Sequence, residues 1–301
     1  MTENKSKYLL SAFLSASIWG FFSIPLRNLK TYPSEQILYY RIFTSLVVIW
    51  LAILLFRKKE LIKDIRYILS SHTKTKWTIV LQIIGSTILL TLNWYTFIYA
   101  INHISIKSGA FAYMVCPLIT AFGGYLILKE HLSKLQILAL GTATLSILML
   151  ATGSLIEVTW SIIIAALYAF YLIIQRKMQH LDKLNVLAFQ ISIAVLLMLP
   201  FFIKDYTVIQ SNLDFWLNIV LIAVVFTIVP LFLSLFALIG IPSSTLGIII
   251  YINPIIAFSI AISHFNEKID PHQLLAYLLL LFAVFLFNWH LIKDMLTFKR
   301  K

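Results

Sequence analysis

Charged residues are scarce in this sequence. Only 12% of the 301 residues are Asp, Glu, Lys or Arg, whereas 60% are hydrophobic, and soluble proteins are typically about 25% charged. A surface that faces water cannot be built from half that share. Several apolar segments reach about 20 residues, the length that crosses roughly 30 Å of hydrocarbon. The composition therefore predicts an all-α, polytopic membrane protein.

Cysteine is almost absent. The single thiol, Cys116, lies within an apolar segment next to Pro117, so the chain has no disulfide framework. The first apolar segment follows Lys5 and Lys7 and is long, and more apolar segments come after it. We therefore expect it to be a retained first helix, not a cleaved signal peptide.

The patterns of several enzyme classes and of pumps are also missing. The seven histidines form no H-x-x-E-H or H-E-x-x-H spacing, and there is no Gly-x-Ser-x-Gly elbow or Walker-type loop. The sequence thus disfavours a membrane enzyme and transport powered by ATP hydrolysis within this chain. We expect no metal and no cofactor. No Asp or Glu falls in the middle of a span, although proton-driven pumps usually carry one there. This favours facilitated diffusion, exchange or coupling through another group.

Ten apolar segments are candidates for membrane-spanning helices, and a polar loop separates the second from the third. The loop, residues 57–76, is expected to form a short amphipathic surface helix. The expected spans are residues 8–26, 37–56, 77–101, 106–128, 135–151, 155–175, 186–203, 215–239, 243–264 and 273–292.

The second half of the chain repeats the layout of the first. At an offset of 137 residues Pro117 matches Pro254 and Glu130 matches Glu267, and at an offset of 149 Arg27 matches Arg176. We predict two five-helix repeats, residues 8–152 and 155–292. An odd number of helices per repeat makes the two copies enter the membrane from opposite sides, as in many secondary transporters.

The distribution of basic residues predicts the orientation. If the N-terminus is inside, the inside segments hold 18 Lys and Arg, the outside segments hold five, and Arg41 lies within a span. This bias favours cytoplasmic location of both termini in a bacterial-type inner membrane. Because the basic residues sit in short loops and not on one face of a soluble domain, the net charge of +12 does not indicate nucleic-acid binding.

Apart from Lys107 and Glu157 at the ends of two spans, Arg41 is the one full charge inside a predicted span. Such a charge is expensive in lipid, so it should face the bundle interior. It could hold a substrate carboxylate or phosphate through its planar fork, or it could snorkel outward or pair with Glu35. Pro117 and Pro254 are related by the repeat, and paired broken helices point to a mid-membrane site with a gating role; packing kinks are the alternative.

Amides and aromatics complete the candidate site. Asn93 and Asn253 lie on helices that also carry aromatics and prolines, although hydrogen bonds between helices explain most buried amides. Trp19, Tyr99 and Tyr113 are candidates for a cavity wall, although aromatics near span ends usually belong to the interface belt. Glu130 and Glu267 each follow a proline-containing helix and are expected to be structural, capping a helix or pairing with a lysine.

The order and spacing of several segments resemble a known family. They are SASIWGFFSIPL, YYRIF, NWYTFIYAIN, SGAFAYMVCPLITAFGGYLILKEHL and SSTLGIIIYINPIIAFSIAISHFNEK. Together they are similar to the EamA domain of the drug/metabolite transporter superfamily, and most of all to its RarD-like branch. The resemblance implies ten helices in two inverted repeats and a central cavity. It places Trp19, Asn93, Trp94, Tyr99, Tyr113, Pro117, Tyr168 and Tyr251 on helices that line this cavity, and matches Arg41 to a family arginine.

The chain departs from the family pattern at Lys129 and Asn266, where glycine often precedes the glutamate, and Cys116 and Asn253 make the positions before the two prolines different. The resemblance implies export or exchange of small metabolites, such as amino acids, and in some members of drugs. We expect an alternating-access carrier, with a channel or scaffold subunit as the alternative. Its expected partners are membrane lipid and a small substrate, anionic or zwitterionic because of Arg41; both a monomer and a homodimer stay open.

Overall fold

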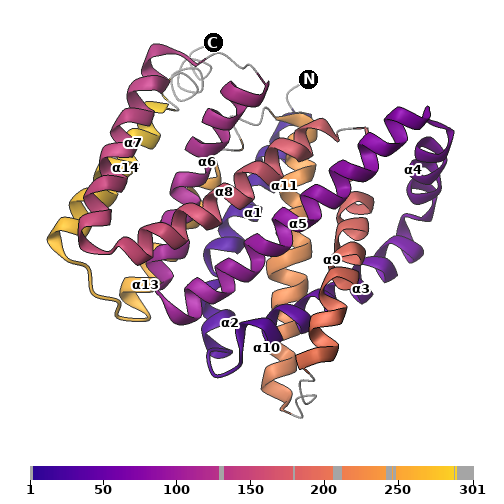
Figure 1. The fold of residues 1–301 in the computed structure, drawn as a ribbon, viewed down its shortest axis with the longest axis horizontal. Helices are drawn as coiled ribbons and strands as arrows, with labels where there is room; N and C mark the ends of the chain where they lie inside the picture. The colour runs from indigo at the N-terminus through magenta and orange to yellow at the C-terminus, as the bar shows by residue number, and fades with distance from the viewer. Residues whose placement is uncertain are drawn as a thin grey trace.

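A computed structural model describes residues 3–128, 132–178, 180–205, 212–241, 246, 249–287 and 289. The regular structure of these residues is helical throughout, which confirms the all-α class for this part of the chain (Figure 1). The first half contains α1 (Glu3–Gly20), α2 (Ser23–Asn28), α3 (Ser34–Phe56), α4 (Lys58–Ser70), α5 (Thr73–His103), α6 (Ile106–Leu128) and α7 (Lys134–Gly153). The second half contains α8 (Leu155–Lys177), α9 (Lys183–Asp205), α10 (Leu213–Ala223), the π-helix η1 (Val224–Ile228), α11 (Val229–Gly240), α13 (Ile252–Ser263) and α14 (Pro271–Phe287).

The first and the eighth predicted spans are interrupted. The first is divided between α1 and α2 by a turn at Phe21 and Phe22. Pro25, the third residue of α2, has no N–H to donate to the carbonyl of Phe21, and a proline fits best in the first turn of a helix, where this N–H would have no partner. The eighth predicted span is divided into α10, η1 and α11, with Pro230 just after the π-helical turn.

The loop at residues 57–76 contains the amphipathic helix that the sequence predicts. α4 buries Leu61 and Asp64 and exposes most of its other side chains. Three of its exposed side chains are Ile62, Ile65 and Leu69. Because residues three and four positions apart lie on one helical face, these form an apolar strip that suits a membrane surface.

In the described part of the chain, seven segments are long and apolar enough to cross a bilayer. Among the described residues three further apolar helices are shorter, at residues 134–150, 252–263 and 271–287. The multi-pass character of the chain is thereby supported, while the count of ten spans and the inverted repeat remain predictions. Glu130, Lys129 and residues 243–245 lie outside the described residues.

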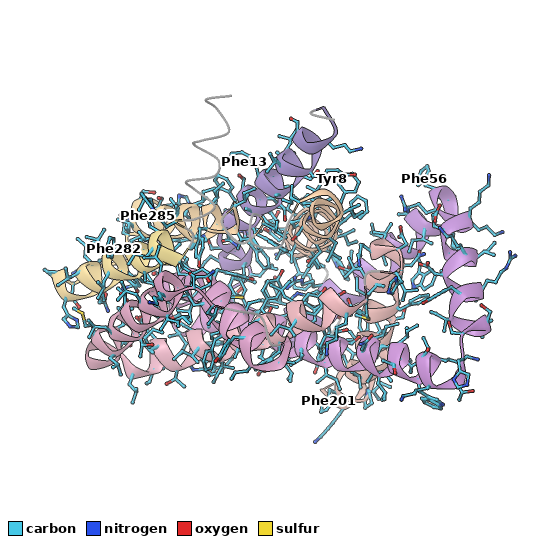
Figure 2. All side chains as sticks on the ribbon, turned by 90° about the horizontal axis from the view of Figure 1, so that it is seen from above. Tyr8, Phe13, Phe56, Phe201, Phe282 and Phe285 are labelled. Atoms are coloured by element: carbon cyan, nitrogen blue, oxygen red, sulfur yellow. The ribbon has the colours of Figure 1, made fainter. Side chains whose placement is uncertain are left out.

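The exterior of the bundle is apolar. Large hydrophobic side chains project from its periphery, among them Phe13, Phe56, Phe201, Phe282 and Phe285 (Figure 2). Phe56 is 82% exposed. In water such a surface would promote association, whereas lipid chains are as apolar as these side chains.

Helices of the two halves pack against each other. α1 contacts α11 and α13, α3 contacts α9, and α8 contacts α5 and α6, while α7 and α14 form a closely packed pair. Gly20 of α1 shows how close one crossing is, because a Cβ added there would lie 2.6 Å from Cβ of Ile256 on α13. Small residues permit such close approach of membrane helices. The interior between the halves holds the buried polar residues described next.

Candidate functional site

Arg41 of α3 lies in the interior of the bundle and is only 2% exposed. Its Nε donates a hydrogen bond to Oγ1 of Thr227 at 2.8 Å. The centre of its guanidinium lies 4.6 Å from the ring centroid of Trp94 and 5.2 Å from that of Phe22. Both distances are within the range of cation–π attraction, which is stronger when the cation is shielded from water.

No carboxylate accompanies this cation in the described part of the chain. The ion pairs found there are Arg27–Glu267 and Arg57–Asp182, and Glu35 instead accepts a hydrogen bond from Tyr95 at 2.7 Å. The expected alternatives of outward snorkelling and pairing with Glu35 therefore do not describe this arginine. Its Nη1 is buried without a hydrogen-bond partner among the described residues.

The π-helical turn explains how Thr227 reaches Arg41. Thr227 donates its hydroxyl proton to the carbonyl of Ile222 and offers its oxygen to the arginine. Pro230 removes the N–H that an α-helix would offer to the carbonyl of Phe226, and the indole Nε1 of Trp19 donates to that oxygen at 3.1 Å. π-Helical turns often occur at functional sites, and this one joins α1 and α3 to the second half.

A small cavity of about 20 Å³ lies beside the arginine. This volume is enough for about one water molecule. Six of the predicted site residues line it: Trp19, Arg41, Asn93, Trp94, Tyr113 and Tyr168.

Three lining residues were missed by the sequence analysis: Phe22, Phe97 and Leu231. Phe97 could have been found, because it lies one helical turn after Trp94 and must share its face. Phe22 could have been found because Pro25 indicates a break in the helix just before it, where Phe22 lies. Leu231 carries no local feature that distinguishes it from the other leucines of its span.

Several aromatic side chains around the cavity pack edge to face. Tyr168 lies 6.3 Å from Trp19 and 6.0 Å from Tyr113, measured between ring centroids. Tyr113 in turn lies 5.6 Å from Phe97. Asn93 donates its amide to the carbonyl of Ile164 at 2.9 Å, so it also forms the hydrogen bond between helices that the sequence left open.

Three predicted site residues lie elsewhere. Tyr99 stacks on Trp160 at a centroid distance of 4.8 Å. Tyr251 and Asn253 are buried but do not line this cavity. Within the described residues, the Tyr251 hydroxyl and the Asn253 amide nitrogen have no hydrogen-bond partner.

The two repeat-related prolines differ in their helical settings. α6 continues without interruption across Pro117, whereas α13 begins at Ile252, so that Pro254 lies in its first turn after the turn at Tyr251. The expected gating role of this pair stays a prediction. No group of three or more His, Cys, Asp or Glu side chains in the described ranges could hold a metal ion.

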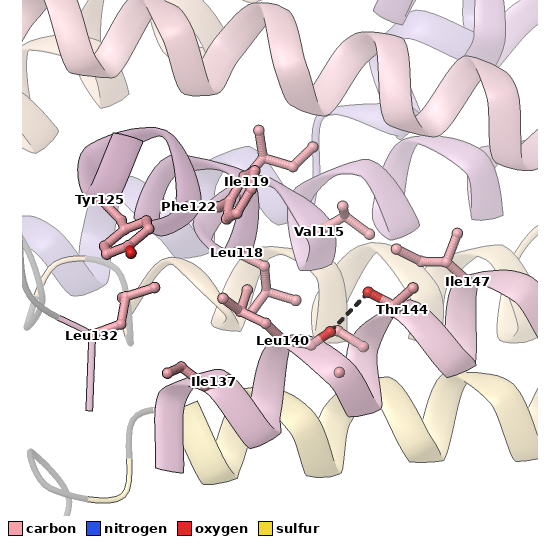
Figure 3. A pocket seen from close by; sticks show the side chains of 12 residues that line it. Val115, Leu118, Ile119, Phe122, Tyr125, Leu132, Ile137, Leu140, Thr144 and Ile147 are labelled. Carbon is pink, nitrogen blue, oxygen red and sulfur yellow. Dashed lines mark hydrogen bonds between the residues drawn. The ribbon is translucent and has the colours of Figure 1, made fainter. Parts of the chain in front are cut away.

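A larger groove of about 830 Å³ lies between α6 and α7 (Figure 3). None of the predicted site residues lines it, and most of its walls are Leu, Ile, Val, Phe and Ala side chains. The hydroxyl of Thr144 is already bonded to the carbonyl of Leu140. Because pockets for polar metabolites need convergent polar groups, the small cavity at Arg41 is the better candidate site.

Comparisons with known proteins place the chain in a family. The model of the EamA-like transporter family matches residues 6–152 and 155–289. The chain is 26% identical to the protein RarD of Streptomyces exfoliatus, over 95% of this chain and 90% of that protein. It is 27% identical to an uncharacterised transporter of Pseudomonas aeruginosa, over 96% and 95%.

A solved structure shows the same fold. The crystal structure of a protein that is 15% identical in sequence superposes with a TM-score of 0.63, covering 93% of this chain and 96% of that one. The predicted resemblance is confirmed because the family model covers nearly the whole chain. The chain belongs to the EamA-like transporter family, and it is a multi-pass membrane protein.

Proposed function

We propose that this protein is an inner-membrane secondary transporter that exports or exchanges small metabolites, such as amino acids or related compounds and drugs, by alternating access. The site around Arg41 binds the substrate. The observation that carries the proposal is a buried arginine without a carboxylate partner in the described part of the chain. Family membership supports transport, and the site supports the substrate class.

An anionic or zwitterionic substrate fits this arginine. A buried cation is strongly disfavoured unless a counter-charge accompanies it. The rings of Trp94 and Phe22 and the hydroxyl of Thr227 compensate part of this penalty. A carboxylate could pair with the remaining donors, because the guanidinium presents its N–H groups as a planar fork.

The cavity must expand before a metabolite can enter. Pockets for small molecules typically measure about 300–1,000 Å³, far above the roughly 20 Å³ beside Arg41. The walls come from both halves, since Trp94 and Tyr113 precede residue 153 whereas Tyr168 and Leu231 follow it. Relative rocking of the repeats, residues 8–152 and 155–292, would open the cavity to one side at a time.

Exchange or facilitated diffusion suits the site better than proton coupling, because none of the described residues that line it carries a carboxylate. Both termini are proposed to be cytoplasmic on the basis of the 18-to-5 distribution of basic residues. Lipid chains would fill the apolar groove between α6 and α7.

The test is counterflow in proteoliposomes preloaded with a mixed pool of metabolites. Uptake of labelled amino acids is followed without a pH gradient and should saturate. Replacing Arg41 by Gln removes a charged hydrogen-bond donor worth about 1.5–3 kcal/mol, so the half-saturating concentration should rise roughly 10- to 150-fold. Lys63→Gln, at an exposed position of α4, is the matched control and should leave the concentration unchanged.

Two results would count against the proposal. Flux that does not saturate in the unmodified protein would favour a channel. Saturable counterflow that is unchanged by Arg41→Gln would retain the carrier and reject the site.

A further inference from the structure

Glu267 lies at a junction between the two halves. Its Oε1 is 3.0 Å from Nη2 of Arg27 in α2, and it accepts the backbone N–H of Ile106 at 3.0 Å. Its Oε2 accepts the backbone N–H of Lys107 at 3.3 Å. The carboxylate therefore caps the N-terminus of α6, a helix 160 residues earlier in the chain, and binds an arginine at the same time. Both partners favour its negative charge.

Neighbouring residues reinforce this junction. Nζ of Lys107, which is 7% exposed, donates to the carbonyl of Lys268 at 2.7 Å and lies 3.3 Å from Oε1 of Gln273. Asn266 adopts a φ of 52°, a left-handed conformation that Asn tolerates better than most residues. This bend sets the direction of Glu267, whose N–H is held by the carbonyl of Ala261 at 2.9 Å.

The elements joined by Glu267 also form walls of the cavity at Arg41. Phe22 immediately precedes α2 and lies beneath the guanidinium, and Tyr113 projects from α6 two turns after its capped end. Figure 1 shows α2 at the lower edge of the bundle, away from α4. Movement of the ends of α2 and α6 away from each other would therefore separate two walls of the cavity on this side.

The ion pair has the properties of a contact that can open. The side chains of Arg27 and Glu267 are 18% and 15% exposed, so water can reach both after separation. Partly exposed ion pairs contribute much less to stability than their number suggests, since solvent screens them. The capping bonds to the α6 backbone can likewise be replaced by water at a helix terminus.

We propose that Glu267 is a positioning residue of the transport cycle: with Arg27 and the N-terminus of α6 it forms a latch that closes the substrate cavity on one side of the membrane. This inference rests on the proposed function only in requiring that the cavity opens alternately. The latch is closed in this structure, and it must break once in each cycle for substrate to pass on that side.

The test measures access to the cavity and uses no substrate. Cys116 is the only cysteine of the chain, so Cys116→Ala gives a background without thiols. Leu231→Cys then places a reporter in the cavity wall, where Leu231 is 2% exposed. A membrane-impermeant maleimide is applied to sealed vesicles of either orientation, and modification of the reporter is quantified by peptide mass spectrometry.

Glu267→Gln keeps the shape of the side chain and removes its charge. We expect it to raise the labelling rate at least about tenfold from the side of Arg27, which should be the outside, and not from the other side. The matched control is Asp182→Asn, which breaks the ion pair between Arg57 and Asp182. This pair joins the end of α3 to the start of α9, with Nη2 of Arg57 2.6 Å from Oδ2 of Asp182. It should leave labelling from the Arg27 side unchanged.

A cross-link provides the converse test. Arg27→Cys and Glu267→Cys, joined by a short cleavable reagent before labelling, should abolish access to the reporter from the Arg27 side, and cleavage should restore it. An unchanged labelling rate in Glu267→Gln, or rapid labelling in the cross-linked protein, would overturn the latch. Neither result affects the proposal for Arg41, which is judged by counterflow alone.

Discussion

Replacing Thr227 by Val tests whether the π-helical turn holds the buried arginine. The substitution keeps the branched shape and removes the oxygen that accepts a hydrogen bond from Nε of Arg41 at 2.8 Å. A hydrogen bond to a charged group contributes about 1.5–3 kcal/mol. The upper part of this range applies, because Arg41 is buried and no carboxylate in the described residues compensates for the loss.

A loss of about 2.5 kcal/mol should lower the unfolding temperature by a few degrees. Cys116 permits a direct assay, because this thiol is buried in the folded protein and unfolding exposes it to a fluorogenic reagent. Thr227→Ser retains the hydroxyl and should unfold close to the temperature of the unmodified protein. In counterflow, Thr227→Val should also raise the half-saturating substrate concentration, since the guanidinium loses its fixed orientation.

Equal unfolding temperatures for Thr227→Val and Thr227→Ser would refute this reasoning. Such a result would mean that Arg41 obtains its stabilisation from the rings of Trp94 and Phe22 alone. A large loss in both variants would instead point to the packing of the turn.

Three other substitutions test particular contacts. Trp19→Phe removes the donor to the carbonyl of Phe226 and should destabilise the protein by about 1–3 kcal/mol, measured by the same thiol assay. Gly20→Leu should sharply reduce the yield of folded protein in size-exclusion chromatography, because a Cβ there would lie 2.6 Å from Cβ of Ile256; Gly20→Ala combined with Ile256→Ala should recover part of it. Asp64→Ala leaves two donors, the backbone N–H of Asp182 and the amide of Asn185, without their acceptor, and should increase proteolysis of the α4 connection.

The periodicity and length of the apolar segments were sufficient to place most helices. α6 has the predicted bounds of residues 106 and 128, because an apolar run between polar connectors leaves little freedom at its ends. The amphipathic α4 was also predicted correctly, since a polar segment between two spans must stay at the membrane surface. The turn at Phe21 and the π-helical turn were missed, although Pro25 and Pro230 indicated a disturbance in each span.

The candidate site was predictable in its residue types and not in its partners. A charge within a membrane span must be compensated, so the sequence identified Arg41 as a candidate site residue. Aromatic residues at helical spacing could then be predicted as further members of the site. Thr227, 186 residues away, carried no local pattern that identified it as the acceptor for Arg41. Tyr99 and Tyr251 satisfied the same criteria as Tyr113 and still lie outside the cavity, because the rotation of each helix is set by packing.

For Glu267, too, the sequence predicted the type of interaction and not the partner. Its position after a proline-containing helix predicted a capping role, and it does cap a helix, but that helix is α6 and not the next one in the chain. Since the cap crosses from one half to the other, an interaction expected to be structural becomes a contact that relative motion of the halves must break. A closing residue of a two-part carrier therefore differs from an ordinary helix cap only in which helix it reaches, and that difference appears in the tertiary structure alone.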